Sequence, residues 1–311
     1  MDAIFVILNW NKSELTIQAV KNIENVEKKT IGIIVVDNGS NASEREKLVE
    51  FARKNGWDIL DEKGIATNNQ RVLLLAKENY GYAKGNNLGL KLAKSIGYEW
   101  AVVMNNDVIV EKPTVEILLE IGKAEQKIAI VGPKILDLDG KRQGPFEREG
   151  IYTYFFYQIF FPILYPFEKI RIKLHERKNS KVPFVSAYYV MGCFMLMNLT
   201  IMEELEWFDE HTFLYGEELI MAEKIKKKGY KVAYTERAYV KHIHGASTSE
   251  IKDQRISIKL NSILYYFKNY RGYGKIRLAL VKSGFYWSNF VINPLVNKIK
   301  KIIKSTIKNK V

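Results

Sequence analysis

Residues 100–111, W-A-V-V-M-N-N-D-V-I-V-E, decide the fold of this chain. The apolar run 101–104 has the length and composition of a strand that is buried on both faces of a parallel sheet. It ends in Asn105, Asn106 and Asp107. Polar groups at the carboxyl end of a buried strand lie where open α/β sheets bind ligands, and a carboxylate beside amides suits a hard divalent cation that also holds phosphate oxygens. A solvated turn would contain the same residue types, so these three residues alone do not distinguish a cation site from a turn.

Strand-length apolar runs alternate with helical patterns along the first half of the chain. Further strands are expected at 3–8, 31–36, 71–76 and 128–131, and helices are expected to begin at Ser13, Ser43, about Ala83 and Pro113. Four alternations with short connections predict an α/β fold, a doubly wound and mostly parallel sheet with right-handed crossovers. Because parallel strands end at a common edge, the polar clusters 9–11, 37–40 and 105–107 should gather there.

The second half of the chain departs from this alternation. Residues 151–167 contain nine aromatic side chains and no charge. Such a run forms a core or dimer contact, or, with its prolines and tyrosines, a lid or a wedge at a membrane interface. Beyond it we expect a buried strand at 190–197, a helix at 201–205, a helix from Glu217 to 228 that Gly229 ends, and short strands at 231–234 and 238–240.

The composition is that of a globular protein. With 311 residues and 47% hydrophobic content the chain can bury a full core, as one large domain with an appendage. The single cysteine, Cys193, excludes an internal disulfide and a cysteine-cluster metal site, and suggests a reducing compartment. The first residues include Asp2 and are not expected to form a signal peptide. No stretch reaches the roughly 18 apolar residues of a membrane-spanning helix.

The net charge of +13 is concentrated at the end of the chain. Residues 252–311 hold 14 Lys and Arg against one acid, Asp253, whereas the remaining 34 basic and 34 acidic residues balance. Residues 289–308 place isoleucines at helical spacing with lysines on the remaining surface, which predicts a basic amphipathic helix at an anionic membrane surface. Its apolar stripe makes nucleic acid the less fitting partner, and none is expected.

Seven stretches, in order over residues 3 to about 248, resemble the family-2 glycosyltransferases, particularly their rhamnosyltransferase-like branch. They are V-I-L-N-W-N, V-V-D-N-G-S, E-N-Y-G-Y-A-K-G-N-N-L-G, M-N-N-D, G-C-F-M-L, W-F-D-E-H-T-F-L-Y-G-E-E and H-I-H-G-A-S. The resemblance implies the A-type nucleotide-sugar-binding fold and, mostly, inversion of the anomeric configuration. We therefore expect a glycosyltransferase domain at 1–250, with a donor-binding half at about 1–135 and an acceptor half at about 136–250, followed by a basic helical tail at 251–311.

The resemblance also assigns a metal site. Asp107 matches the last acidic position of the family's metal motif, whose first position is Asn105 here. His242 aligns with a family histidine near that metal, and Gly245 and Ser247 support the register. Oxygen ligands and retained waters suit Mg or Mn. A cation there would stabilise the charge that develops on the β-phosphate of the leaving nucleotide.

For the donor, Asp37 matches the family residue that contacts the base or ribose of the nucleotide. The sequence D-N-G-S at 37–40 would also favour an Asx turn after a strand. Asn87 is expected near the diphosphate or the sugar. Leu88 replaces a commonly basic residue, and Lys84 is expected to supply part of that charge. The remaining expected donor-binding residues are Asn9, Asn11, Asn38 and Asn106.

For catalysis, Glu218 aligns with the general base of the family, which is usually Asp after Glu. A general base must reach the acceptor hydroxyl as it attacks the anomeric carbon. Glu218 carries one methylene more than Asp, and Ile220 stands where the family often has a second acid. Glu217 is the alternative base.

These features predict an inverting, metal-assisted transfer of a sugar from a nucleotide-diphosphate donor to a lipid-linked or cell-envelope glycan. The protein is expected at the cytoplasmic face of the cell membrane as a peripheral protein, with a homodimer as a further possibility. A non-catalytic protein of the same fold that binds nucleotide-sugar or glycan is the alternative. A nucleotidyltransferase would carry a Gly-rich, Arg-bearing loop where this chain has L-N-W-N-K, and a dinucleotide oxidoreductase would carry G-x-G-x-x-G.

Overall fold

The chain folds into two compact units. The computed structural model describes residues 3–27, 32–63, 67–161, 164, 167, 182–243, 254–296 and 298. The first unit comprises Met1–Glu147 and Asn179–Ser262, and the second comprises Arg148–Lys178 and Ile263–Val311. The aromatic run therefore belongs with the C-terminal helices, whereas the division expected from the sequence, at residue 250, placed it in the first domain.

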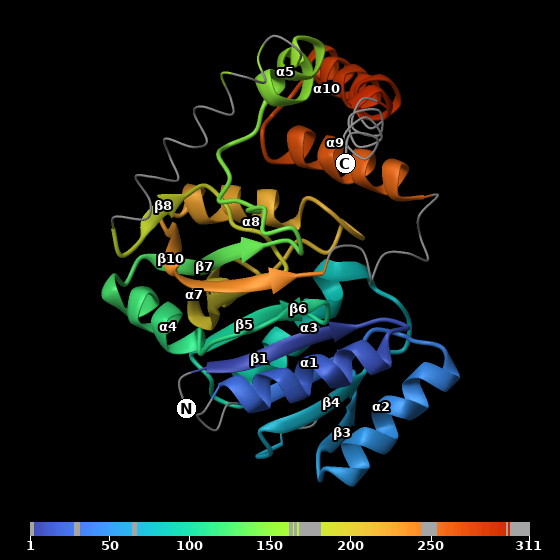
Figure 1. Ribbon diagram of the computed structural model, residues 1–311, viewed down its shortest axis with the longest axis vertical. Coiled ribbons are helices and arrows are strands. Elements are labelled where there is room, and N and C mark those ends of the chain that lie inside the picture. Colours follow the sequence, from blue (N-terminus) through green and yellow to red (C-terminus); the bar gives the residue numbers. More distant parts are fainter. Residues whose placement is uncertain are drawn as a thin grey trace, which may run out of the picture. The chain divides into compact units, whose positions relative to one another are not determined.

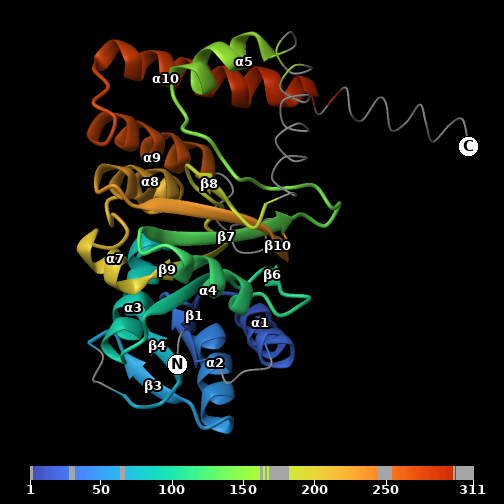
Figure 2. The same cartoon turned by 90° about the vertical axis from the view of Figure 1, so that its left-hand side faces the viewer.

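The first unit is built on a single ten-stranded sheet (Figures 1 and 2). Its strands are β1 (Ala3–Asn9), β2 (Gly32–Asp37), β3 (Asp58–Asp61), β4 (Arg71–Leu75), β5 (Trp100–Asn105), β6 (Val108–Ile109), β7 (Ile128–Leu136), β8 (Val185–Ala187), β9 (Phe194–Asn198) and β10 (Lys231–His242). The order is β3-β4-β2-β1-β5-β9-β7-β10-β6, and β8 pairs with β10. Strands β1 to β5 run parallel, and β9 is antiparallel to both β5 and β7.

Helices cover both faces of this sheet. They are α1 (Ser13–Val26), α2 (Ala42–Lys54), α3 (Gly81–Ser95), α4 (Val115–Ala124), α7 (Leu199–Glu204) and α8 (Glu217–Lys227). Phe5 and Ile7 of β1 pack in the core beneath α1, α2 and α4, while Ile4 and Val6 pack in the opposite core with α3, α7 and α8. This division follows from the alternation of side chains along a strand. The prediction of a doubly wound, mostly parallel α/β sheet is confirmed.

Several element boundaries differ from the sequence-based expectation. The edge strand β3 was not expected, because D-I-L-D is short and only partly buried. The helix expected to begin at Pro113 begins at Val115, after Thr114. The two short strands expected between 231 and 240 form one strand, β10, whose register shifts between Tyr234 and Tyr239. The strand expected from Val190 begins only at Phe194, because the chain turns at Gly192 and Cys193.

The second unit is helical. It contains the π-helix η1 (Tyr152–Phe156), α5 (Tyr157–Ile159), the latter part of α9 (Arg255–Asn269), α10 (Lys275–Trp287) and the π-helix η3 (Ser288–Ile292). The Tyr154 ring packs edge-on against Phe267, with 5.3 Å between ring centroids. The expected tail helix is helical from Asn289 to residue 296, and most of its remainder lies outside the described residues. Within the part of the chain that is described, no helix combines the length and the apolar character needed to cross a membrane.

Gly284 allows α10 to approach η1 at backbone distance. A Cβ atom at this position would lie only 1.7 Å from the carbonyl oxygen of Tyr154. Glycine in the middle of a helix normally costs stability relative to alanine, so its presence here reflects this close contact. The close packing of α10 against η1 therefore requires glycine at position 284.

We expect Gly284→Ala to destabilise the protein by roughly 1–3 kcal/mol, because the added methyl group forces the two helices apart. At an exposed helical site the same change would be stabilising, so the sign of the effect is diagnostic. Thermal unfolding followed by circular dichroism measures it. The neighbouring exposed change Ser283→Ala is the control and should alter the stability by less than about 0.5 kcal/mol. An unchanged or raised melting temperature for Gly284→Ala would contradict the packing described here.

Candidate active site

The carboxyl edge of the sheet holds a buried network of amide, hydroxyl and carboxylate groups. The side-chain nitrogen of Asn9 donates to Asp37 Oδ1 and to Ser40 Oγ, each at 3.1 Å. Thr16 Oγ1 donates to Asn9 Oδ1 at 2.7 Å and accepts from the side chain of Asn106 at 2.9 Å. The ends of β1, β2 and β5 are therefore joined by side-chain hydrogen bonds, and the expected gathering of polar clusters at one edge is confirmed.

Asp37 and Asn38 face different surroundings. Asp37 is fully buried, and its second carboxylate oxygen accepts from Arg45 Nε at 2.7 Å. Asn38 donates to Asn79 Oδ1 at 3.0 Å and to the carbonyl oxygen of Gly81 at 3.1 Å. Asn38 lines a pocket, whereas Asp37 is not part of the lining and bonds to Asn9 and Arg45.

Asn11, another residue expected at the donor, has a left-handed backbone with φ of 52°. Its side-chain oxygen accepts from the backbone N–H of Asn41 at 2.8 Å, and its own backbone N–H donates to Ser40 Oγ at 2.9 Å. Asn11 thus connects the loop after β1 to the start of α2.

The pocket has a volume of about 100 Å³ and combines amides with aromatic rings. It is lined by Leu8, Trp10, Asn38, Asn79, Gly81, Tyr82, Asn105, Asn106, Phe213 and Leu214. Flat rings beside amide groups are suited to stack on a nucleotide base and to bond its edge. Trp10, Asn79 and Phe213 were not expected at the site, although each lies inside a stretch that carries the family resemblance.

One wall of the pocket is held by a glycine with a left-handed backbone. Gly81 has φ of 79°, and a Cβ atom there would lie 2.1 Å from the carbonyl oxygen of Phe213. The next residue, Tyr82, donates its backbone N–H to that oxygen at 2.8 Å. The start of α3 is thereby fixed against the loop that carries Phe213 and Leu214.

Asp107 and His242 form a buried pair beside this pocket. His242 Nε2 lies 3.2 Å from Asp107 Oδ1, and the side chains are 8% and 2% exposed. Pairing of β10 with β6 brings them together, since His242 pairs with Val108. The other ring nitrogen, Nδ1, lies 3.1 Å from Gln143 Oε1, which can only accept. An imidazole that donates Nδ1–H to Gln143 presents the lone pair of Nε2 beside the carboxylate, and a cation can bind between these two groups.

This pair fits a divalent cation that is bound together with phosphate. A carboxylate and an imidazole are suitable ligands, and Gln143 orients the imidazole through its second nitrogen, as is common for metal-bound histidines. In the described part of the chain no three His, Cys, Asp or Glu side chains gather as a metal site. Donor phosphates and water would have to complete the coordination, as is usual for Mg²⁺. Gly245 and Ser247 lie outside the described residues.

Glu218 lies at the start of α8 and is held by a backbone N–H. Its Oε1 accepts from Gly192 N at 3.0 Å, and a Cβ atom on Gly192 would lie 2.4 Å from the same oxygen. Tyr82 donates its hydroxyl to the carbonyl oxygen of Gly192 at 2.6 Å. The absence of a side chain at Gly192 thus leaves room for the carboxylate of Glu218.

Cys193 carries a buried thiol and directly follows Gly192, the residue that donates to Glu218. Burial raises the pKa of Cys193 well above its ordinary value, and the charges of Asp107 and Glu218 raise it further. The backbone agrees with this, because Asn105 N–H donates to the carbonyl oxygen of Cys193 at 2.9 Å, and the preceding residue, Gly192, donates its N–H to Glu218 Oε1. The expected metal residue and the expected base are therefore neighbours in the fold.

Glu217 differs from Glu218 in its surroundings. Its side chain is buried, and burial raises its pKa well above the ordinary value, with a further contribution from the charge of Glu218. Among the described residues Glu217 Oε1 has no hydrogen-bond partner. Glu218 is only half-buried and its carboxylate accepts a backbone N–H, which favours Glu218 as the base of this pair.

Asn87 and Lys84 lie on α3 but contact protein groups. Asn87 receives a hydrogen bond from the backbone N–H of Phe208 at 3.0 Å and donates to the carbonyl oxygen of the same residue at 2.9 Å. It also donates to Glu210 Oε1 at 2.9 Å. Lys84 Nζ lies 3.6 Å from the centre of the Tyr80 ring. In this structure neither side chain lines the pocket.

Comparison with known proteins places this site in a family. The model of glycosyl transferase family 2 matches residues 4–205. Uncharacterised proteins of Mycobacterium bovis and Mycobacterium tuberculosis are each 28% identical over 170 residues, which is 53% of this chain and 54% of theirs, so the match spans about half of their length. The O-antigen chain rhamnosyltransferase RfbN of Salmonella typhimurium is 36% identical over 66 residues, 21% of each chain.

Solved structures share the fold. GalNAc-T7, crystallised with UDP, GalNAc and Mn²⁺, superposes with a TM-score of 0.59 at 13% identity, covering 96% of this chain and 57% of that one. The mannosyltransferase PcManGT of Pyrobaculum calidifontis, in complex with GDP-Man and Mn²⁺, superposes with a TM-score of 0.55 at 14% identity, covering 93% and 70%. These likenesses show the A-type glycosyltransferase fold, and the family match extends over most of the first unit. The chain belongs to glycosyl transferase family 2.

Proposed function

We propose that this protein transfers a sugar, with inversion, from a nucleotide-diphosphate donor to a hydroxyl group of a lipid-linked or cell-envelope glycan. The observation that carries the proposal is the placement of the Asp107–His242 pair and of Glu218 on two hydrogen-bonded segments, 105–107 and 192–193, beside a pocket of amides and aromatic rings. An electrophile-stabilising pair and a base on the same edge of the sheet are what a direct displacement at a sugar carbon requires.

The donor nucleotide is proposed to occupy the pocket beside Trp10 and Phe213. Asn38 and Asn79 would bond the edge of the base, while Asp37 and Asn9 hold the surrounding loops through their own hydrogen bonds. The diphosphate would extend from there past Asn106 to Asp107. Lys84 and Asn87 stay proposed donor contacts, and both would have to change their present partners to reach the diphosphate.

Asp107 and His242 are proposed to hold Mg²⁺ or Mn²⁺ together with the donor phosphates. When bound, such a cation offsets the negative charge that develops on the leaving nucleotide. Gln143 keeps the imidazole in place, and Glu218 takes the proton of the acceptor hydroxyl as the new glycosidic bond forms. One displacement by the acceptor on the face opposite the leaving group inverts the anomeric carbon.

The acceptor is proposed to be presented at the inner face of the cell membrane. The charge of residues 252–311 and the amphipathic pattern of 289–308 support attachment to an anionic surface as a peripheral protein. A homodimer packed through the aromatic run is the other use of these residues. The rhamnosyltransferase relative supports a hexose or deoxyhexose as the transferred sugar.

Removal of Asp107 should abolish the metal dependence of donor binding and leave the fold intact. A screen of UDP-, GDP- and dTDP-sugars by thermal shift, with and without Mn²⁺, identifies the donor, since a ligand at a hundred times its Kd adds about 2.7 kcal/mol of stability. In Asp107→Ala the Mn²⁺-dependent part of that shift should disappear. Asp139→Ala, on an exposed turn, is the control and should keep it. An equal Mn²⁺-dependent shift in Asp107→Ala would exclude Asp107 from the metal site.

Replacement of the base should affect chemistry and leave binding nearly unchanged. Glu218→Gln keeps the size of the side chain but removes its basicity, so kcat for transfer should fall by ~10²-fold or more at nearly constant donor affinity. Glu217→Gln should have a smaller effect. Steady-state kinetics on purified variants measure both. If Glu217→Gln proves the more damaging change, the roles of the two carboxyl groups are reversed.

A methyl group at position 192 should displace the carboxylate of Glu218 without changing its chemical identity. Gly192→Ala places a Cβ atom against Glu218 Oε1, and the flexible carboxylate has to move. A displacement of about 1 Å at a reacting group costs up to ~10²-fold in rate, so transfer should fall while the melting temperature changes little. Gly150→Ala is the matched control, because its nearest neighbour would be 3.4 Å away. Normal turnover by Gly192→Ala would show that the position of Glu218 is not critical.

A further inference from the structure

The second unit exposes most of the large apolar side chains found on the surface. Fifteen such side chains are exposed among the described residues, and eleven belong to this smaller unit. They are Tyr152, Phe156, Ile159, Phe160, Phe167, Ile276, Tyr286, Trp287, Phe290, Val291 and Leu295. Exposed apolar side chains concentrated in this way mark a surface that contacts a partner or a membrane.

The exposed side chains form stripes along two helices that pack together. Tyr152, Phe156 and Phe160 follow each other at intervals of four residues and are 59%, 45% and 48% exposed. Helix α10 contacts this segment, as Figures 1 and 2 also show. It continues into η3 with a second stripe, in which the rings of Tyr286 and Phe290 lie 5.9 Å apart. We call these two stripes the aromatic face.

The inward sides of the same helices already have their partners. Tyr154 packs on Phe267, Gly284 lies against the backbone of Tyr154, and Phe285 and Ile292 are buried. Among the described residues of the second unit, these inward-facing side chains pack together without the aromatic face. That face is therefore not needed for the packing of the unit, and its side chains remain available to another surface.

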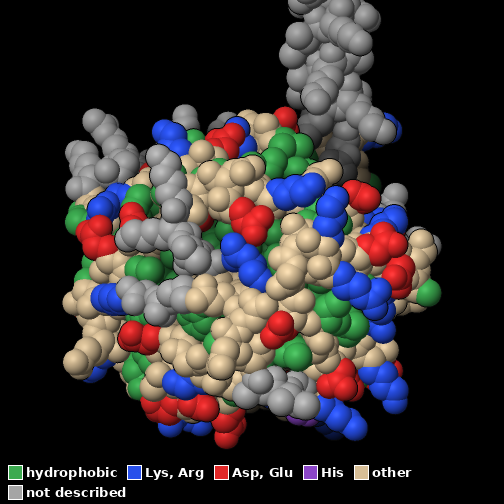
Figure 3. Space-filling model, turned by 90° about the horizontal axis from the view of Figure 1, so that it is seen from below, with side chains coloured by type: hydrophobic (Ala, Val, Ile, Leu, Met, Phe, Trp, Pro, Cys, Tyr) green, Lys and Arg blue, Asp and Glu red, His purple; other side chains and the backbone are tan. Residues whose placement is uncertain are grey.

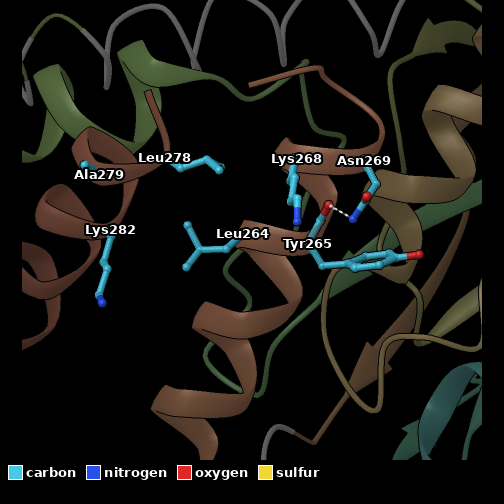
Figure 4. Close-up of a pocket in the computed structure, with 7 residues that line it drawn as sticks. All are labelled: Leu264, Tyr265, Lys268, Asn269, Leu278, Ala279 and Lys282. Carbon is cyan, nitrogen blue, oxygen red and sulfur yellow. Dashed lines mark hydrogen bonds between the residues drawn. The ribbon is translucent and has the colours of Figure 1, made fainter. Parts of the chain in front are cut away.

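The charge of the second unit is predominantly positive, because residues 148–178 and 263–311 contain 17 Lys and Arg against three acids, Glu149, Glu168 and Glu176. Residues 263–311 contain eleven Lys and Arg and no Asp or Glu. A groove of about 430 Å³ between α9 and α10 has Leu264 and Leu278 along it, with the amino groups of Lys268 and Lys282 beside them (Figure 4). The underside of the first unit differs, because acidic and basic side chains are interspersed there (Figure 3).

We propose that the second unit docks on an anionic lipid surface, with the aromatic face at the level of the headgroups and the groove lysines at lipid phosphates. Tyrosine, tryptophan and phenylalanine beside lysine are the residues that favour this boundary. The proposal rests on the peripheral membrane location proposed above, and replaces attachment by the tail alone with attachment by a surface that is already folded.

Charge and chemistry select lipid over the other partners. A second copy of the chain would bring two predominantly basic surfaces together, and like charges would oppose the contact. A nucleic acid would neutralise the lysines but leave the aliphatic side chains of Ile159, Ile276 and Val291 in water. An anionic bilayer interface takes up both the charge and the apolar area.

The test is co-sedimentation of the full chain with phosphatidylcholine vesicles that contain or lack phosphatidylglycerol. Wild type should bind the anionic vesicles and be released by salt. Phe156→Ser combined with Phe290→Ser removes one ring from each stripe and should lower the partition coefficient about tenfold. Leu138→Ser, at a side chain that is 67% exposed on the first unit, is the control and should bind as wild type does.

A second pair of variants tests the charge. Lys268→Gln with Lys282→Gln should reduce the preference for anionic vesicles several-fold, whereas Lys226→Gln with Lys227→Gln, two exposed lysines of α8, should not. Contact of the aromatic face itself is measured with brominated lipids, which should quench the fluorescence of wild type more than that of Trp287→Phe. Circular dichroism confirms that each variant is folded.

Each contrary result has a defined meaning. Failure of wild type to bind any vesicle would overturn both this proposal and the membrane location proposed above. Binding that survives in the Phe156→Ser/Phe290→Ser variant would overturn the aromatic face alone and leave the tail as the anchor. A shift from dimer to monomer in that variant would assign the face to a second copy of the chain. Donor hydrolysis, measured without vesicles, should be the same in all of these variants, so that a failed docking test is separate from a failed catalytic assignment.

Discussion

The site depends on one buried amide. Asn9 stands at the end of the central strand β1 and contacts Asp37, Ser40 and Thr16 through a single side chain. Asp37 and Ser40 lie at the end of β2 and in the loop after it, whereas Thr16 is on α1 and accepts a hydrogen bond from Asn106. Polar groups this deeply buried are costly unless all are satisfied, so the network specifies one arrangement of the loops. The geometry of the pocket and of the loop that carries Asp107 depends on this arrangement.

The same constraint explains which predictions from the sequence succeeded. Continuous apolar runs ending in amides and carboxylates determine both the parallel strands and the edge at which their polar ends meet, and Asn9, Asp37 and Asn106 do lie there together. Residues 101–104 lie in β5, in the middle of the sheet, in agreement with their apolar character. Strand β3 was not predicted, because an edge strand that is half exposed needs no hydrophobic pattern.

Other features could not be predicted because they depend on contacts between distant segments. Asn87 carries the family motif, yet its amide spans the backbone of Phe208, a partner that no local pattern reveals. The pair of Gln143 and His242 forms only when a turn after β7 meets the end of β10. Burial also separates Glu217 from Glu218, because it raises the pKa of Glu217. The sequence cannot predict which of two adjacent glutamates is the buried one.

Strand β10 supplies His242 at its last position and pairs with β6 immediately after Asp107. The two residues are therefore contributed by segments that leave the ribosome at very different times. Domains form from the N-terminus during synthesis, and contacts between remote segments are made late in folding. The core of β1 to β5 can assemble while the site still lacks its histidine. A chain that stops short of β10 would lack the imidazole, so the pair of Asp107 and His242 forms only after most of the chain has been made.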